Sequence, residues 1–132
     1  MVLQRITRDC AVKIGGTFRR RVQDGDLCLF DRARTVWIAA YRAREGDPIA
    51  SVGELYRPDR KPDEEWERRE DGMFGRAYLI SESTPGQACW TLTSISASKQ
   101  TIILMSFYFD DERELDWAVS TWHSLRFAGS GE

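Results

Sequence analysis

Short apolar segments separated by turn residues make up most of the chain, and this pattern is typical of antiparallel strands. Asp24-Gly25-Asp26, for example, lies between two apolar segments and favours a tight hairpin. Residues 36–41 are apolar on both alternate faces, which predicts a strand covered on both sides. Residues 101–109 are β-branched and aromatic on both faces, which predicts a central place in the sheet. The predicted strands cover residues 11–14, 18–22, 27–30, 35–41, 74–81, 89–96 and 101–109.

Two segments have helical periodicity instead. Asp47-Pro48 is typical of an N-cap followed by proline in the first turn, and Pro58 ends the short helix that starts there. A longer C-terminal helix begins at residues 110–111. The apolar stripe of that helix consists of Leu115, Ala118, Val119, Trp122 and Leu125. Residues 63–70 around Trp66 have too weak a periodicity to decide whether they form a second short helix.

The connections between the predicted strands determine the fold class. Connections of two to six residues are shorter than the crossover of about a dozen residues that parallel pairing requires, so the strands that they join are antiparallel. The sequence therefore predicts an α+β fold, with an antiparallel β-sheet of about six to seven strands and a long C-terminal helix and a short middle helix packed on it. Residues 57–65 resemble a linker but are too short to separate two cores, so residues 1–132 are expected to form a single domain.

Composition and charge exclude several classes of protein. The 42% of hydrophobic residues is enough for a core and too much for a disordered tail. The longest apolar stretch, residues 102–109, is far shorter than the roughly 18 residues of a membrane-spanning helix. Nineteen basic against 21 acidic side chains give a net charge of −2, which argues against a partner that is nucleic acid or an anionic membrane. Residues 19–21, three consecutive arginines, are expected on a solvated strand edge.

The N-terminal residues and the cysteines indicate the cellular compartment of the protein. The N-terminal residues are charged where a secretory signal needs an apolar region. Cys10, Cys28 and Cys89 are an odd number without a CxxC pair, which favours reduced thiols and a cytoplasmic location. Sixteen arginines against three lysines are typical of a GC-rich, bacterial genome.

The C-terminal residues carry a resemblance to a known fold family. Residues 117–127, Trp-Ala-Val-Ser-Thr-Trp-His-Ser-Leu-Arg-Phe, follow a long strand and an acidic break. This arrangement resembles the PsbP-like fold, which includes an extrinsic photosystem II subunit, a Ran-binding import factor and chaperones of type VI secretion effectors. The resemblance implies a small α+β scaffold that binds other proteins and rarely catalyses a reaction.

Asp116, Ser120 and His123 are the residues most like a catalytic set, because their spacing places them on one helical face. A catalytic serine, however, needs an exposed elbow and an oxyanion hole, and a serine within a helix has neither. A single histidine with scattered carboxylates is also a weak metal-ligand set. The sequence therefore predicts an exposed helix face there, with no catalytic residue, no metal and no cofactor.

The predicted partner-binding residues are Trp117, Arg113, Thr121 and Trp66. Trp117 lies opposite the apolar stripe of the helix, beside Arg113 and Thr121, as a contact hot spot would. Trp66 stands alone among charges. Alternatively, the segment carrying Trp66 or the residues after Phe127 fold over Trp117. Alternation in residues 94–98 further predicts an uncovered polar sheet face carrying Ser94, Ser96 and Ser98.

The expected function is that of a non-catalytic protein-binding module, a small bacterial cytosolic adaptor, chaperone or accessory factor. Its partner is another protein, and neither nucleic acid nor a membrane is expected. The alternative is a small-molecule-binding domain or enzyme with a pocket between sheet and helix, near Trp37, Trp90 and Tyr108. An obligate homo-oligomer, such as a homodimer, is a third interpretation.

Overall fold

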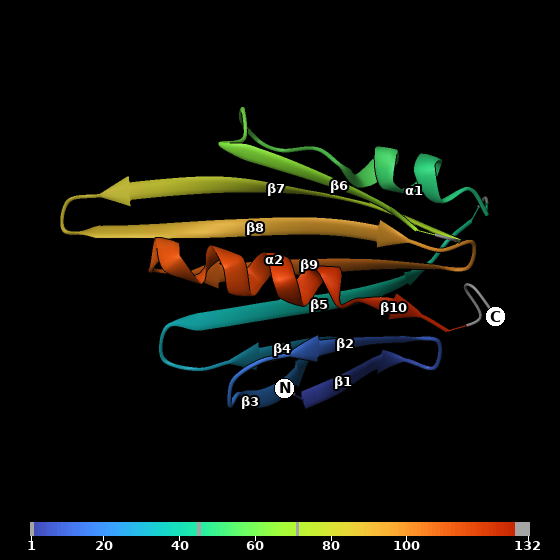
Figure 1. Ribbon diagram of the computed structural model, residues 1–132, viewed down its shortest axis with the longest axis horizontal. Coiled ribbons are helices and arrows are strands. Elements are labelled where there is room, and N and C mark those ends of the chain that lie inside the picture. The colour runs from blue at the N-terminus through green and yellow to red at the C-terminus, as the bar shows by residue number, and fades with distance from the viewer. Residues whose placement is uncertain (1, 45, 71, 129–132) are drawn as a thin grey trace.

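A seven-stranded antiparallel sheet carries most of the chain in the computed structural model, which describes residues 2–44, 46–70 and 72–128 (Figure 1). Its strand order is β3-β4-β5-β9-β8-β7-β6, and a second sheet has the order β1-β2-β10. The strands are β1 (Val2–Thr7), β2 (Cys10–Ile14), β3 (Arg19–Gln23), β4 (Asp26–Phe30), β5 (Arg34–Arg42), β6 (Glu64–Glu70), β7 (Met73–Thr84), β8 (Gln87–Ala97), β9 (Thr101–Phe109) and β10 (Arg126–Phe127). The helices are α1 (Pro48–Leu55) and α2 (Leu115–His123), the latter preceded by a 3₁₀ turn, Glu112–Glu114.

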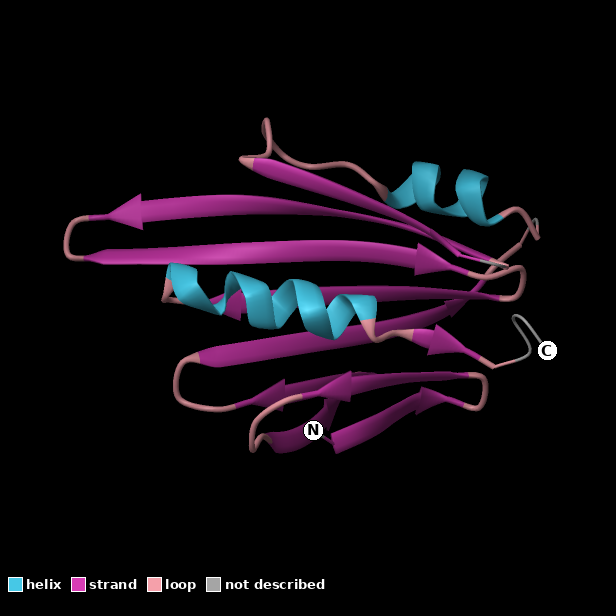
Figure 2. Cartoon of the chain, in the orientation of Figure 1, coloured by secondary structure: helices cyan, strands magenta, loops and turns pink. Residues whose placement is uncertain are grey.

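The two faces of the large sheet have different coverings. Alternate residues of each strand point to opposite faces. On the inner face, odd-numbered side chains of β9 such as Met105 and Phe107 join α2 and β2 in the main hydrophobic core. On the outer face, α1 packs against β7 and β8 through the fully buried Val52. Figure 2 shows the same arrangement coloured by secondary structure.

Small residues let α2 approach the inner face closely. Trp122 is fully buried, and its indole Nε1 donates a hydrogen bond to Ser96 Oγ at 2.9 Å. Gly75 lies beside them, where a Cβ atom would come within 2.8 Å of Ser96 Oγ. Arg68 of β6 donates hydrogen bonds to the carbonyl oxygens of Trp122 and Leu125, at 2.6 and 3.3 Å. These contacts fix the C-terminal end of α2 on the sheet.

The prediction of an uncovered polar face at Ser94, Ser96 and Ser98 is wrong. Ser94 and Ser96 are fully buried and Ser98 is nearly so. The hydroxyl of Ser94 donates to the carbonyl oxygen of Met105 at 3.1 Å, and Ser96 accepts from Trp122. The side chains of Ser94 and Ser96 are small enough to lie beneath α2, and hydrogen bonds satisfy their hydroxyls.

The α+β class and the antiparallel sheet are confirmed, and so is the central position of β9. The short middle helix is α1, which begins at an N-cap where the carboxylate of Asp47 accepts from the N–H of Ile49 at 3.1 Å. The prediction of a long C-terminal helix is wrong, because α2 has nine residues and is preceded only by the short 3₁₀ turn. Past Ser124 the chain leaves the helix to pair β10 with β2.

Three strands lie outside the predicted set. β1 pairs with β2, and β10 pairs with the other edge of β2. β6 occupies the segment whose periodicity was undecided, and it pairs along its whole length with β7.

The thiols of Cys10, Cys28 and Cys89 are free. Within residues 2–44, 46–70 and 72–128, no helix has the length and apolar character that crossing a membrane requires.

Candidate functional site

Trp117 packs against the main core, with its ring edge-on to the buried Phe107 at a centroid distance of 5.8 Å, so the prediction that it lies opposite the core-facing side of α2 is wrong. Its indole Nε1 donates to the carbonyl oxygen of Gly15 at 3.1 Å, and its ring stacks on Phe18 with centroids 5.7 Å apart. The guanidinium of Arg34 lies 4.7 Å from the centre of the Trp117 ring. The loop between β2 and β3 and the start of β5 therefore cover Trp117, rather than the segment with Trp66.

The four residues predicted for partner binding do not form one surface. Thr121 is 3% exposed and its side chain faces the core. Arg113 is exposed and pairs with Asp111 at 2.7 Å, beside the start of α2. Trp66 is half-buried on β6 and packs against the main core. Contact between one partner and all four side chains is therefore incompatible with this geometry.

Asp116, Ser120 and His123 are exposed along α2, as their spacing predicts. None of the hydrogen bonds between described residues joins one of these side chains to another. Partial burial and the nearby Arg68 guanidinium lower the pKa of His123. Within the part of the chain that the structure describes, no three His, Cys, Asp or Glu side chains form a cluster suited to a metal ion.

The outer face of the seven-stranded sheet is covered only in part. Among the described residues, α1 is the one helix or strand that packs on this face, and it lies over β7 and β8. On β5 and β9, Tyr41 is 51% exposed and Tyr108 is 44% exposed. The expectation that β5 is covered on both sides is therefore wrong for its second half, since residues 40–42 are exposed.

Strand register places four large side chains together on this uncovered part. Trp37 lies opposite Ser106, Ala39 opposite Leu104, Tyr41 opposite Ile102 and Thr35 opposite Tyr108. The residues Trp37, Tyr41, Leu104 and Tyr108 are named here the aromatic platform. At its edge, the Arg21 guanidinium of β3 lies 5.4 Å from the Phe30 ring centre and 6.0 Å from that of Trp37.

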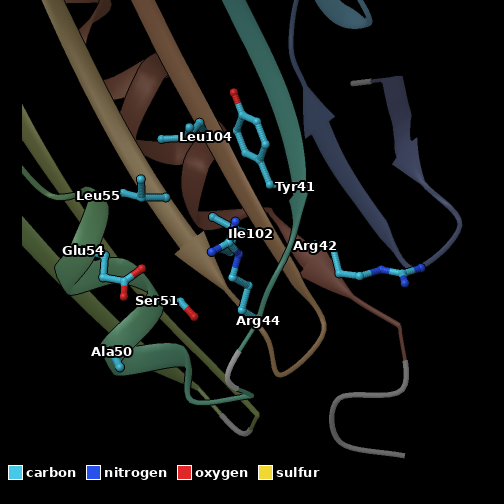
Figure 3. A pocket seen from close by; sticks show the side chains of 9 residues that line it. All are labelled: Tyr41, Arg42, Arg44, Ala50, Ser51, Glu54, Leu55, Ile102 and Leu104. Carbon is cyan, nitrogen blue, oxygen red and sulfur yellow. The ribbon is translucent and has the colours of Figure 1, made fainter.

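A cavity of about 430 Å³ lies where the aromatic platform meets α1 (Figure 3). It is lined by Tyr41, Arg42, Arg44, Ala50, Ser51, Glu54, Leu55, Ile102 and Leu104. Figure 3 shows Arg44 extending toward Ile102, whereas Arg42 points away from the other labelled side chains. The cavity thus combines an apolar floor on β9 with polar side chains from α1 and the end of β5.

The position of α1 beside this cavity is fixed at both ends. Asp47 caps its first turn, and at the other end the Tyr56 hydroxyl donates to Glu65 of β6. The Arg76 guanidinium lies 3.6 Å from the centre of the Tyr56 ring. Burial and the hydrogen bond to Glu65 raise the pKa of Tyr56, so its hydroxyl keeps its proton at neutral pH.

The pocket predicted near Trp37, Trp90 and Tyr108 does not exist as one space. Trp90 is on the inner face, where it stacks on Phe109 with centroids 6.3 Å apart. Trp37 and Tyr108 are on the outer face. Alternation within each strand could have separated the faces, but only the register between strands shows which side chains are neighbours.

No family model matches this chain, and no curated protein matches it. Among solved structures, it is similar to a protein from Bacteroides thetaiotaomicron VPI-5482, with a TM-score of 0.67 and 11% sequence identity. The match covers 93% of this chain and 46% of that protein, so the chain spans about half of its length. A likeness at this identity shows the fold alone. The resemblance to the PsbP-like fold therefore stays a prediction.

Proposed function

We propose that the protein is a non-catalytic protein-binding module, an adaptor or accessory factor, whose partner docks on the aromatic platform. The observation that carries this proposal is the uncovered outer face of β5 and β9, where Tyr41 and Tyr108 are about half exposed. Tyrosine, tryptophan and arginine are the residue types enriched where protein partners bind.

The platform has the physical properties of a docking surface. Full burial of a large apolar side chain stabilises by about 1.5–3 kcal/mol. Covering the exposed half of each ring by a partner would therefore contribute about 1 kcal/mol to binding. Trp37, Tyr41 and Tyr108 stand on paired strands, so little backbone freedom is lost when a partner binds. The Arg21 guanidinium, held over Phe30 and Trp37, adds a cation at the edge for an acidic group of the partner.

Photo-cross-linking tests this proposal directly. Tyr108 is replaced by p-benzoylphenylalanine, and the protein is irradiated in lysate of the cells that produce it. We expect one dominant covalent adduct with a second protein, because the ring at this position would lie within the interface. The matched control carries the same group in place of Leu3, which is also exposed but lies on β1 of the other sheet.

The control separates docking from chance encounters. An adduct formed equally from positions 108 and 3 would contradict the proposal, and so would the lack of any adduct at position 108. An adduct that forms only between two copies of the chain would contradict a separate partner and would show that the platform is a homodimer interface.

A further inference from the structure

The cavity beside α1 has the size of a small-molecule site. Its volume of about 430 Å³ falls within the roughly 300–1,000 Å³ of typical ligand pockets. Leu55 of α1 and Ile102 and Leu104 of β9 give it an apolar lining. An occupant therefore needs an apolar body, and the polar side chains around the lining determine what else it needs.

Ser51 places a hydroxyl on the cavity wall that has no hydrogen-bond partner among the described residues. The residue is 6% exposed, and its side chain forms no hydrogen bond with another described residue. Among the described residues, every side-chain oxygen or nitrogen fully enclosed by the protein has a partner. The Ser51 hydroxyl must therefore open onto free space, and Figure 3 shows it pointing from α1 into the cavity. A hydroxyl that opens onto a cavity can donate to an acceptor of a ligand bound there.

Arg44 supplies a positive charge at the same place. No ion pair within 4.0 Å joins its guanidinium to a carboxylate of another described residue. Figure 3 shows the guanidinium beside Ile102, between α1 and Tyr41. A guanidinium binds a carboxylate through two parallel hydrogen bonds, and this geometry favours a planar anion.

Glu54 limits the charge that the cavity accepts. Its carboxylate lines the α1 side, and it is not paired with Arg44. A second anionic group on the ligand would therefore meet a like charge, which is unfavourable. The lining suits one carboxylate at Arg44 and an uncharged remainder.

We propose that this cavity binds an apolar monocarboxylate, a molecule with one carboxylate and an apolar chain or ring. Arg44 pairs with the carboxylate, and the Ser51 hydroxyl donates to it. The apolar body lies along Leu55, Ile102 and Leu104. This site goes beyond the protein-binding function, since it uses side chains of α1 that the platform does not include.

Titration with decanoate, kept below its micellar concentration, tests the proposal. Decanol and decylammonium have the same chain without the charge and with the opposite charge. Calorimetry gives the affinities, and methyl NMR locates the ligand. We expect saturable binding of decanoate, at least about tenfold tighter than that of decanol, because a charge-assisted hydrogen bond is worth more than about 1.4 kcal/mol. The methyl signals that shift are expected to be those of Leu55, Ile102 and Leu104.

Two substitutions of opposite charge sharpen the test. Arg44→Gln is expected to weaken decanoate binding about tenfold and to leave decanol unchanged, whereas Glu54→Gln is expected to tighten decanoate binding. Both side chains belong to exposed residues, so the fold should be retained, and circular dichroism checks this. The proposal is overturned if decanoate does not saturate, if decylammonium or decanol binds equally well, or if Arg44→Gln changes nothing. Methyl shifts confined to Val2 and Leu3 of β1 would also overturn it.

Discussion

Trp117 shows how a single residue can have the pattern of a contact residue and the role of a structural one. Its ring is held by Phe18, by the guanidinium of Arg34 and by a hydrogen bond to Gly15. Asp31 and Glu114 in turn pair with Arg34, at 2.8 and 3.4 Å. One indole therefore connects α2, the loop after β2 and the start of β5.

We expect Trp117→Ala to lower the free energy of unfolding by about 3 kcal/mol, because a large aromatic contact and a hydrogen bond are lost together. Trp117→Phe keeps a ring against Phe18 and should lose less. Urea denaturation measures both variants. If Trp117→Ala leaves stability unchanged but abolishes partner capture, Trp117 belongs to a binding surface after all.

Asp31 makes the same region sensitive to acid. Burial alone would raise the pKa of its carboxyl, but hydrogen bonds from Arg34 and from the N–H groups of Ala33 and Arg34 outweigh burial and lower it below 3.8. A pKa lowered by folding stabilises the protein above the unfolded value, and this stabilisation is lost as the pH falls through the folded value.

We expect Asp31→Asn to be less stable than wild type at about pH 6 and the difference to shrink toward about pH 3, because the stabilisation by the ionised Asp31 carboxylate decreases as the pH falls below 3.8. Urea denaturation at the two pH values measures the difference. A stability difference that does not change with pH would mean that the charge of Asp31 contributes nothing.

At the scale of elements, the contact between α2 and the large sheet depends on the absence of a side chain. A Cβ atom at Gly75 would lie 2.8 Å from Ser96 Oγ and 3.2 Å from Trp122 Cζ2. Gly53 on α1 provides the opposite case, since nothing lies within 4 Å of a Cβ built there. The same substitution should therefore have opposite effects at the two positions.

We expect Gly75→Ala to destabilise the protein by about 2 kcal/mol, because the added methyl displaces Trp122 from Ser96. Gly53→Ala should stabilise it by about 0.5–1 kcal/mol, because alanine favours a helix more than glycine does. Thermal denaturation followed by circular dichroism compares the two. Equal shifts of the melting temperature would show that the close approach at Gly75 is unimportant.

The elements that the sequence predicts are those whose pattern is local. Asp47-Pro48 marks the start of α1, and the aromatic and β-branched residues of β9 mark the central strand. The sequence does not predict β6 because six of its seven residues are Glu or Arg, which have low strand propensity, and pairing with β7 determines its conformation instead. The sequence does not predict the length of α2 either, because the chain leaves the helix at Ser124 so that β10 can pair with β2.

At the scale of the whole molecule, the candidate site depends on relations that no local pattern contains. The alternation in β9 separates Leu104 from Met105, but it does not say which of them α2 covers. The cavity requires α1 to lie beside β9, which is distant from it in sequence. Hydrophobic periodicity placed Trp117 opposite the core stripe, but its ring packs against Phe107 of the core and is covered by Phe18, and no local pattern contains either contact.

Docking of a partner protein on the aromatic platform requires the exposed rings of Tyr41 and Tyr108. The most direct measurement compares stoichiometric partner capture by wild type, by Tyr41→Ser/Tyr108→Ser and by Leu3→Ser, after denaturation shows that all three are equally stable. Leu3 is exposed on β1, outside the platform. We expect wild type and Leu3→Ser to retain the same partner and the tyrosine double variant to lose it. Equal capture by all three proteins, or no partner for any of them, would contradict this expectation.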